Sequence, residues 1–192
     1  MGAKVQIRST EILADAAAVT KTITFQYRAW DGADVVCTRE VYDPGDAAAV
    51  LPFDEARATV LLTRQMRLPA WLHGAHESLL EACAGRIGAE TPKACILREA
   101  REEMGYALYE LQEVFQAYAS PGYSTEKITC FLAAYDPSKK ISEGGGLEDE
   151  GEHIEIVELD LDLAFEMIGA GKIVDAKTIM LLQHLKLSLQ GQ

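Results

Sequence analysis

The sequence predicts an α+β protein in which most of the chain forms strands and a few helices pack on them. Three observations support this fold class. Short runs of apolar, β-branched and aromatic residues recur along the chain between turn residues. Helical patterns are confined to three places, each with a signal for its start or its end. The 192 residues are 48% hydrophobic, which suffices for the core of one good-sized domain with or without a smaller N-terminal piece.

The N-terminal part of the chain is predicted to form an antiparallel β-hairpin. Residues 19–29 alternate between apolar and polar side chains, residues 30–33 have turn composition, and residues 35–42 return as a second strand. The run Pro44-Gly45-Asp46 then interrupts the pattern. We therefore expect an N-terminal β region at residues 1–45 and the main domain at residues 46–192.

The main domain is predicted to mix strands with helices. Apolar runs between turn residues predict strands at 47–52, 59–63, 78–83, 111–119, 127–135 and 153–159. Helices with one apolar face are expected at residues 160–170, where Asp160 suits the N-cap, and at residues 176–189. The interval 137–151 is polar, glycine-rich and acidic, and we expect a loop there.

A further helix is predicted between Thr91, which suits an N-cap, and Gly105, which suits the left-handed residue that ends a helix. Near its end, Glu99, Glu102 and Glu103 have the spacing i, i+3 and i+4, which places three carboxylates on one face. Like charges at this spacing repel, and the helix dipole disfavours anions in the last turn. We therefore expect a positive partner at this face.

The residues alone leave two interpretations of the acidic face open. Hard carboxylate oxygens on a short, capped helix are ligands suited to Mg²⁺ or Mn²⁺, with water and substrate phosphates completing the coordination. The alternative is a solvated acidic face with Arg98 and Arg101 as its neighbours, which is how most glutamate-rich helices are explained.

Composition restricts the partners. The net charge is −12, the pI is near 4.8, and no block of lysine and arginine is present, so we expect neither a nucleic-acid partner nor an anionic membrane surface. No apolar run approaches the roughly 20 residues that span a bilayer. Cysteines 37, 83, 95 and 130 form no CxxC pair, and we interpret them as reduced, mostly buried thiols of a cytoplasmic protein.

The segment from residue 85 to residue 106 resembles the Nudix box, in which Gly and Glu precede an Arg-Glu-x-x-Glu-Glu-x-Gly helix. The matching residues are Gly85, Glu90, Arg98, Glu99, Ala100, Glu102, Glu103, Gly105 and Tyr106. Seven residues separate Glu90 from Arg98, as the pattern requires, but four rather than five separate Gly85 from Glu90. This departure puts the loop geometry in doubt and leaves the glutamate helix intact.

The resemblance implies a Nudix-type α/β/α sandwich with a mixed sheet. It also implies a Mg²⁺ site, with Mn²⁺ as a possible substitute, built from Glu99, Glu102, Glu103 and the backbone carbonyl of Ala84. Glu103 is expected to act in catalysis as well as in metal binding. Glu90, near the start of the helix, is expected to have a structural role.

The acidic loop at residues 144–156, GGGLEDEGEHIEI, is a second candidate for the site. We expect its glycines to make it mobile. By itself the loop is better explained as a solvated surface loop, and the neighbouring glutamate helix is what makes it a candidate for the site. Its DEGEHI run resembles a segment that carries the general base in one branch of the Nudix family. The resemblance implies that Glu150 is the base and Glu152 a further metal ligand, although the choice between neighbouring acids is open.

Other motifs imply where a substrate binds. RQMR, residues 64–67, resembles a diphosphate-binding segment of this branch, so Arg67 is expected to contact the diphosphate, with Arg39 as a second candidate. Pro121, 15 residues after the box, resembles the mark of enzymes that hydrolyse ADP-ribose and nucleoside diphosphate sugars. Glu126 in the same segment is expected to bind substrate, although a surface role is an equal alternative.

Together these motifs extend the resemblance over nearly the whole chain. It implies Mg²⁺-dependent hydrolysis of a nucleoside diphosphate sugar, with GDP-mannose as the first expectation and ADP-ribose as the alternative. It also implies a homodimer formed through the N-terminal β region. A non-catalytic module that only senses nucleotides is a third possibility, which the presence of all box glutamates disfavours. The residues alone do not distinguish the guanine sugar nucleotide from ADP-ribose.

Overall fold

The computed structural model describes residues 4–75, 77–147, 149 and 151–191 and divides into two compact units. The first unit contains the residues up to Asp46 together with Tyr118–Lys127, and the second contains Ala47–Ala117 and the residues from Ile128 onward. Among the described residues, no helix has both the length and the apolar content needed to cross a bilayer.

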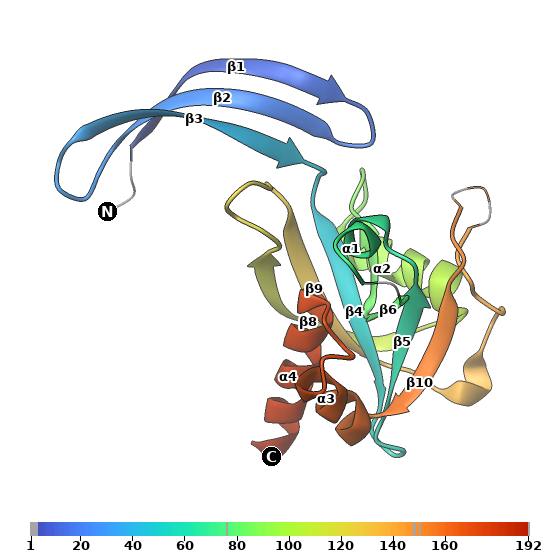
Figure 1. Ribbon diagram of the computed structural model, residues 1–192. Helices are drawn as coiled ribbons and strands as arrows, with labels where there is room; N and C mark the ends of the chain where they lie inside the picture. Colours follow the sequence, from blue (N-terminus) through green and yellow to red (C-terminus); the bar gives the residue numbers. More distant parts are fainter. Residues whose placement is uncertain (1–3, 76, 148, 150, 192) are drawn as a thin grey trace. The chain divides into compact units, whose positions relative to one another are not determined.

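The first unit is a three-stranded antiparallel sheet in the order β1-β2-β3 (Figure 1). Its strands are β1 (Val5–Asp15), β2 (Val19–Arg28) and β3 (Asp34–Asp43). The turn between β2 and β3 is closed by a 2.8 Å hydrogen bond from Ala29 N to Ala33 O, as the turn composition predicted. The predicted hairpin is therefore correct but incomplete, because β1 adds a strand that was not predicted.

The second unit is built on a mixed sheet in the order β10-β5-β4-β9-β8 (Figure 1). Its strands are β4 (Ala47–Asp54), β5 (Thr59–Gln65), β6 (Leu79–Glu81), β7 (Cys83–Arg86), β8 (Tyr109–Tyr118), β9 (Lys127–Ala134) and β10 (Glu155–Asp160). β4 pairs parallel with β9 and antiparallel with β5 and β7, which makes the sheet mixed. The predicted strand 78–83 is in fact two strands, because the chain leaves β5 for β4 at Ala82.

Helices cover both faces of this sheet. They are α1 (Leu68–Leu72), α2 (Pro92–Glu99), the π-helix η1 (Ala100–Met104), the 3₁₀ turn η2 (Pro137–Lys139), α3 (Leu161–Gly169) and α4 (Ala176–Gln190). Successive residues of β4 point to opposite faces. Ala49 and Leu51 join the core under α3 and α4, whereas Ala48 and Val50 join the core under α2 and η1. The predicted α/β/α sandwich is confirmed, whereas α1 was not predicted.

The four cysteines are free thiols, as predicted. Cys83, Cys95 and Cys130 are buried in the second unit, and Cys37 is partly exposed on β3. Burial raises the pKa of Cys83 and of Cys130, the latter to about 12, which keeps both thiols protonated at neutral pH.

Candidate functional site

The glutamate-bearing helix begins and ends where the sequence predicts. Thr91 is the N-cap, and its Oγ1 accepts a 3.2 Å hydrogen bond from Ala94 N, with Pro92 in the first helical position. Gly105 ends the helix with φ +75°, a conformation that glycine adopts at low cost. The last turn differs from the prediction because residues 100–104 form a π-helix, a feature frequently found at functional sites.

The glycine-rich segment 144–146 is attached to the end of this helix. Gly145 N donates to Glu103 O at 2.8 Å, and Gly146 N donates to Glu102 O at 3.1 Å. These bonds satisfy carbonyls that a helix end leaves without partners. All three glycines have positive φ, and a Cβ on Gly144 would lie 2.6 Å from Glu103 O. The glycines therefore serve a close backbone contact, a role other than the predicted mobility.

This attachment brings Glu152 to the glutamates of the helix. Ile154 N donates to Gly145 O at 3.0 Å, and Leu147 N donates to a Glu152 carboxylate oxygen at 3.0 Å. These two hydrogen bonds hold Glu152 and the residues that follow it against the segment that begins at Gly145. Glu99, Glu102 and Glu152 line one pocket of about 540 Å³ together with Ala84 and Arg67. Residues more than 50 positions apart thus converge as the sequence predicted for this set.

Glu103 differs from the other acids of the box because it is buried, with 3% of its surface exposed. Burial is the main reason why its pKa rises to about 7; a hydrogen bond from the Cys83 thiol lowers the pKa, and the charges of Glu99 and Glu152 raise it. Its Oε2 is the one buried side-chain N or O atom of the described residues without a hydrogen-bond partner. A buried carboxylate oxygen in this state is a position for a cation.

Arg98 is the positive partner of the two outer glutamates. Its guanidinium lies 2.7 Å from Glu102, 3.0 Å from Glu99 and 3.2 Å from Glu90. This arrangement matches part of the solvated-face alternative, in which Arg98 neutralises the acids. It also gives Glu90 the structural role expected from the sequence, since Glu90 holds Arg98 from the N-terminal side of the helix.

The donor set fits a divalent cation chemically, although it is not arranged as a finished metal site. No three acidic, histidine or cysteine side chains in the described ranges have the arrangement of a ready metal site. Burial raises the pKa of Glu99, partly offset by Arg98 and reinforced by Glu102 and Glu152, which shows that negative charge is concentrated here. Hard oxygen donors and one orphaned carboxylate oxygen suit Mg²⁺ or Mn²⁺. Arg98 contacts one oxygen of Glu99 and one of Glu102, so each carboxylate keeps a second oxygen that can face a cation.

Ala84 and Gly85 line the same pocket from β7. Ala84 pairs with Ala49 across the β4–β7 ladder, which fixes the backbone whose carbonyl was predicted as a metal ligand. A Cβ on Gly85 would lie 2.0 Å from a carboxylate oxygen of Glu99. The box glycine is therefore required because the Glu99 side chain packs directly on it, and the shortened loop that follows does not disturb this contact.

Arg67 also lines this pocket, as expected of a group that contacts a diphosphate. It lies between β5 and α1, and its side chain is 43% exposed. Its Nε and Nη2 donate to the two carboxylate oxygens of Glu81, at 2.8 and 3.2 Å. Arg64, on β5, does not line this pocket and pairs with Glu155 at 2.9 Å.

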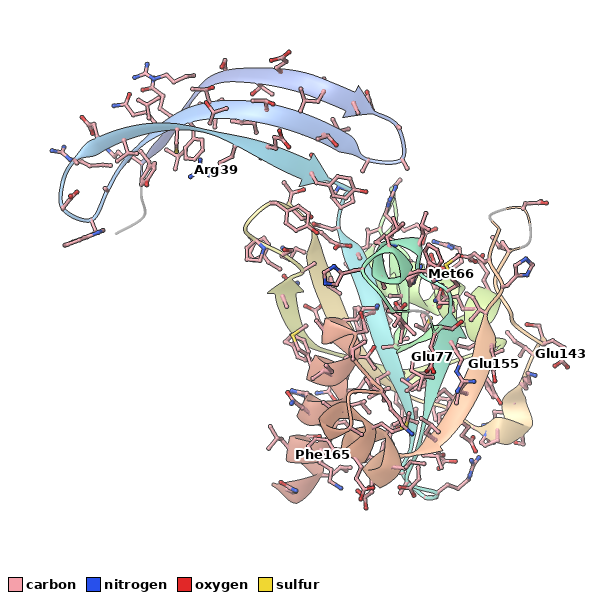
Figure 2. All side chains as sticks on the ribbon, viewed as in Figure 1. Arg39, Met66, Glu77, Glu143, Glu155 and Phe165 are labelled. Carbon is pink, nitrogen blue, oxygen red and sulfur yellow. The ribbon has the colours of Figure 1, made fainter. Side chains whose placement is uncertain are left out.

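Two of the remaining predicted residues belong to the other compact unit, and one lies outside the described residues. Arg39 is exposed on β3, where its Nη1 donates to Thr38 O at 2.8 Å, and Glu126 is partly exposed; both belong to the first unit (Figure 2). Glu150, the predicted base, lies outside the described residues. The structure thus unites Ala84, Glu99, Glu102, Glu103, Glu152 and Arg67 within the second unit.

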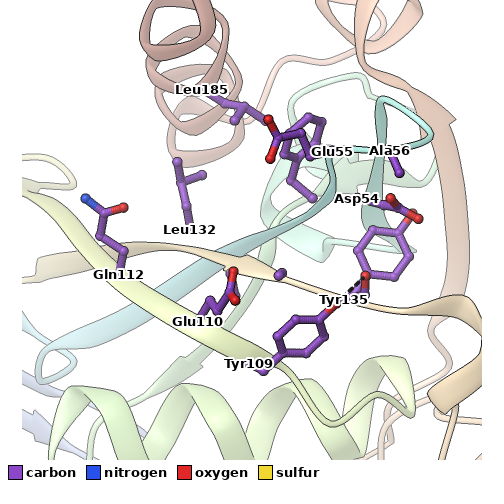
Figure 3. Close-up of a pocket in the computed structure, with 12 residues that line it drawn as sticks. Asp54, Glu55, Ala56, Tyr109, Glu110, Gln112, Leu132, Tyr135 and Leu185 are labelled. Atoms are coloured by element: carbon purple, nitrogen blue, oxygen red, sulfur yellow. Dashed lines mark hydrogen bonds between the residues drawn. The ribbon is translucent and has the colours of Figure 1, made fainter. Parts of the chain in front are cut away.

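Sequence reasoning missed Cys83 and Glu81, which contact Glu103 and Arg67 respectively. Each lies in a short apolar strand just before the box, and the pattern gave no sign that these side chains reach the site. A different pocket of about 400 Å³, lined by Tyr109, Glu110 and Tyr135 among others, contains none of the predicted residues (Figure 3). We therefore place the candidate site at the glutamate helix.

Two protein-family models match this chain. The NUDIX domain model matches residues 43–181, and the model described as the GDP-mannose pyrophosphatase NudK N-terminal domain matches residues 4–42. Proteins named GDP-mannose pyrophosphatase from Cronobacter sakazakii and Pectobacterium atrosepticum are 42% and 43% identical to this chain. The first alignment covers 97% of each protein, and the second covers 96% of this chain and 95% of the relative.

A solved structure described as an ADP compounds hydrolase has a TM-score of 0.74 to this protein, at 19% identity, over 98% of this chain and 96% of that one. At this identity the likeness concerns the fold. Members of the family whose model matches residues 43–181 generally use divalent metal cations, in agreement with the donor set described above. The matched domain covers well over half of the sequence, and the chain belongs to the Nudix family.

Proposed function

We propose that this protein hydrolyses the diphosphate bond of a nucleoside diphosphate sugar, with GDP-mannose as substrate and GMP and mannose 1-phosphate as products. The observation that carries the proposal is the pocket in which Glu99, Glu102 and Glu152 face Arg67, beside the buried Glu103. Carboxylates bind a cation and a guanidinium binds phosphate oxygens, so the pocket offers both kinds of partner that a diphosphate requires. The names of the relatives supply the sugar nucleotide.

We propose a role for each residue of the site; the role of Glu150, which lies outside the described residues, rests on the sequence resemblance alone. The cation would be held by four carboxylates and one backbone carbonyl: those of Glu99, Glu102, Glu103 and Glu152, and that of Ala84. Arg67 would orient the diphosphate. Glu150 accepts the proton of the attacking water, whose oxygen bonds to one phosphorus while the bond from that phosphorus to the bridging oxygen breaks. The bridging oxygen and its electron pair leave with the other phosphate, so one water yields two monophosphates.

We assign Mg²⁺ as the cation, with Mn²⁺ as a substitute, because the donors are hard oxygens. When bound, the cation neutralises phosphate charge and lowers the pKa of coordinated water. Glu103 has the donor atom best suited to it, since its Oε2 has no other partner among the described residues.

ADP-ribose is the second candidate substrate. The observation that favours it is the fold likeness to a structure described as an ADP compounds hydrolase. The pocket at the glutamate helix does not distinguish GDP-mannose from ADP-ribose, because its polar groups would bind only the diphosphate, which both substrates contain, and the cation. We keep Arg39 as the second candidate for contact with the diphosphate and Glu126 as a candidate for substrate binding.

The test is a comparison of initial rates with Mg²⁺ for GDP-mannose, ADP-ribose and a nucleoside triphosphate, with the products identified. A kcat/KM highest for GDP-mannose, with GMP and mannose 1-phosphate as products, is the expected result. A preference for ADP-ribose would replace the first substrate by the second. Rates at background level with all three would contradict hydrolysis and favour a nucleotide-sensing role.

We also propose that the protein is a cytoplasmic homodimer that associates through the sheet β1-β2-β3 of the N-terminal region. None of the described residues 4–46 is buried in the single chain. Apolar side chains on β1 are about half exposed or more, including Val5 (56%), Ile7 (57%) and Ile12 (61%). A three-stranded sheet without a covered face is marginal by itself, so a second copy of the chain would supply the missing cover.

A further inference from the structure

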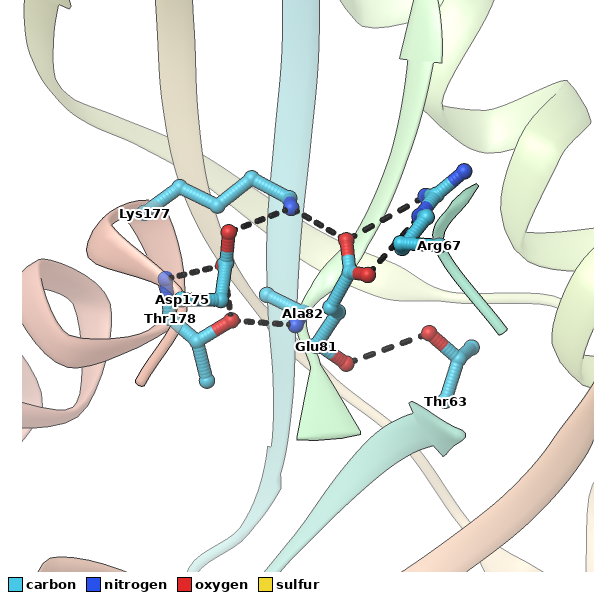
Figure 4. A network of polar contacts seen from close by, with 7 residues as sticks. All are labelled: Thr63, Arg67, Glu81, Ala82, Asp175, Lys177 and Thr178. Carbon is cyan, nitrogen blue, oxygen red and sulfur yellow. Dashed lines mark hydrogen bonds and ion pairs between the residues drawn. The ribbon is translucent and has the colours of Figure 1, made fainter. Parts of the chain in front are cut away.

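A network of charged and polar groups connects to the candidate site through Arg67, and its other members have no role in the function as proposed. At its centre is Glu81, whose side chain is 5% exposed at the end of β6. One carboxylate oxygen accepts a 2.6 Å hydrogen bond from Lys177 Nζ, and both oxygens accept hydrogen bonds from Arg67 (Figure 4). The buried Glu81 carboxylate thus binds both Lys177, near the N-terminus of α4, and Arg67, which lines the pocket.

The position of Glu81 itself is fixed by neighbours on two elements. Lys177 also pairs with Asp175 at 3.1 Å, and Asp175 is the N-cap of α4. Thr178 Oγ1 accepts a 2.7 Å hydrogen bond from Ala82 N, and Thr63 Oγ1 donates to Glu81 O at 3.2 Å (Figure 4). The backbone and the carboxylate of Glu81 are therefore both held, so that the carboxylate is a fixed reference point.

The backbone carbonyl of Arg67 accepts a 2.9 Å hydrogen bond from Trp71 N, but within the described residues its side chain forms hydrogen bonds only to Glu81. Arg67 follows β5 without belonging to it, and its backbone is extended before α1 begins. The two bonds to Glu81 use Nε and one N–H of Nη2, and no hydrogen bond to Nη1 is found within the described part of the chain. The two-point contact fixes the plane of the guanidinium and leaves the Nη1 side for a ligand, in the pocket that Arg67 lines with Glu99 and Glu152.

The Arg67–Glu81 pair differs in burial and geometry from a second arginine–glutamate pair of the same sheet. Arg64 and Glu155 also form an arginine–glutamate pair, but their side chains are 41% and 61% exposed and only one contact of 2.9 Å is present. Exposed pairs of this kind contribute little to stability, whereas burial of Glu81 carries a desolvation cost. A buried, two-point pair at the pocket rim fits orientation of a ligand-binding group.

We propose that Glu81 is a positioning residue that orients Arg67 for the diphosphate. This inference rests on the proposed function, because it takes the diphosphate as the ligand of Arg67. Glu81 does not touch the substrate in this assignment. Its removal leaves Arg67 in place as a charge but frees the guanidinium to rotate, so substrate binding weakens while the groups that carry out the chemistry are unchanged.

The experiment is a double-mutant cycle with Glu81→Gln and Arg67→Ala in the full chain. For each variant, KM and kcat for GDP-mannose are measured with Mg²⁺, and the Kd of inorganic pyrophosphate is measured by calorimetry as a readout without turnover. Glu155→Gln is the matched control, because it removes the same kind of partner from Arg64. Glu81→Asp, which keeps the charge near Lys177 but shortens the reach to Arg67, serves as the second variant if Glu81→Gln lowers the yield of folded protein.

The expected result is that Glu81→Gln and Glu81→Asp raise KM and the pyrophosphate Kd by about tenfold with a smaller change in kcat. In the Arg67→Ala background, the Glu81 change has no further effect on either constant, and Glu155→Gln is silent in both backgrounds. A purely structural role would lower Tm with KM unchanged, or give effects that add to those of Arg67→Ala, and either result would overturn the proposal.

The two readouts separate this proposal from the proposed function. If the wild-type protein binds pyrophosphate but hydrolyses no sugar nucleotide, the proposed function is wrong, and the Kd cycle still decides whether Glu81 orients Arg67. If the wild-type protein does not bind pyrophosphate, Arg67 has no diphosphate to hold, and the positioning role is wrong as well.

Discussion

At the scale of single residues, Glu103 combines burial with an unsatisfied carboxylate oxygen. Both properties are unfavourable for a carboxylate that only contributes to the fold, because burial raises its pKa to about 7. We predict that Glu103→Gln lowers kcat by at least about 100-fold while Tm stays within a few degrees of the wild-type value, since one of several repelling acids is neutralised. Steady-state kinetics and calorimetric melting measure the two effects.

The control for this variant is Glu143→Gln. The Glu143 side chain is 96% exposed and pairs with Lys140 outside the pocket, so the same chemical change should leave both kcat and Tm unaltered (Figure 2). Wild-type turnover in Glu103→Gln would contradict the assignment of Glu103 to the cation.

Glu81 predicts a pH dependence of stability. Burial alone raises its pKa, but the hydrogen bonds and charges of Arg67 and Lys177 outweigh burial and hold the pKa below its usual value. A carboxylate with a lowered pKa stabilises the fold above its unfolded pKa of about 4.3, and this contribution is lost as the pH falls through the lower, folded value. We predict that Glu81→Gln lowers the free energy of unfolding at pH 7, and that the difference from wild type shrinks below about pH 4.

Denaturant unfolding at several pH values between 3 and 7 would measure this difference. Glu155→Gln again provides the comparison, because its partner Arg64 is exposed and the pair contributes little. A constant difference between Glu81→Gln and wild type over the whole pH range would show that the Glu81 charge is not the source of the stability.

At the scale of elements, the start and the end of the glutamate helix could be predicted because both depend on local chemistry. The helix begins at Thr91 and Pro92 and ends at Gly105 because of the local conformational and hydrogen-bonding preferences of these residues, which do not depend on distant parts of the chain. The π-helical last turn could not be predicted, because it depends on the segment 144–146, whose backbone donates to Glu102 and Glu103 from 40 residues away. The sequence showed the glycines of that segment, but it did not indicate that their backbone would form hydrogen bonds to the end of the glutamate helix.

This contact makes Gly105 a sharp test of the element. A Cβ on Gly105 would lie 2.1 Å from Ser142 O, and its φ of +75° disfavours alanine. We predict that Gly105→Ala lowers the free energy of unfolding by about 2 kcal/mol and also lowers kcat, because the loop that carries Glu152 is displaced. Urea unfolding and steady-state kinetics are the measurements.

Gly169→Ala is the matched control, since a Cβ there meets no atom within 4 Å and α3 accepts alanine. This variant should be neutral or stabilised by up to about 1 kcal/mol, with normal activity. Equal behaviour of the two variants would contradict a structural contact between Gly105 and the loop.

At the scale of the whole molecule, the residues alone predicted strands with a few helices packed on them, and the resemblance to the Nudix family implied the sandwich, whose central strand β4 is buried on both faces. Its apolar run supplies Ala48 and Val50 to one core and Ala49 and Leu51 to the other. Strand β1 was missed because all of its residues are exposed and no apolar alternation marks it. Likewise, α1 is too short for a helical period. Regular apolar alternation is the pattern that can be recognised: it predicted β2 and β3, which also contain no buried residue, but it did not predict β1 or α1.

The same exposure leads to a prediction about assembly. β1 is an edge strand of 11 residues in a sheet without a buried residue, and such an edge is suited to pairing with another chain. We predict that the wild-type protein is a dimer at micromolar concentration by light scattering and that Ile7→Asp increases the monomer fraction, because the charge would be buried between copies. Leu187→Asp, at a side chain 68% exposed on α4, should leave the mass unchanged. A wild-type monomer, or a dimer that Ile7→Asp does not weaken, would place the assembly contact elsewhere or remove the need for one.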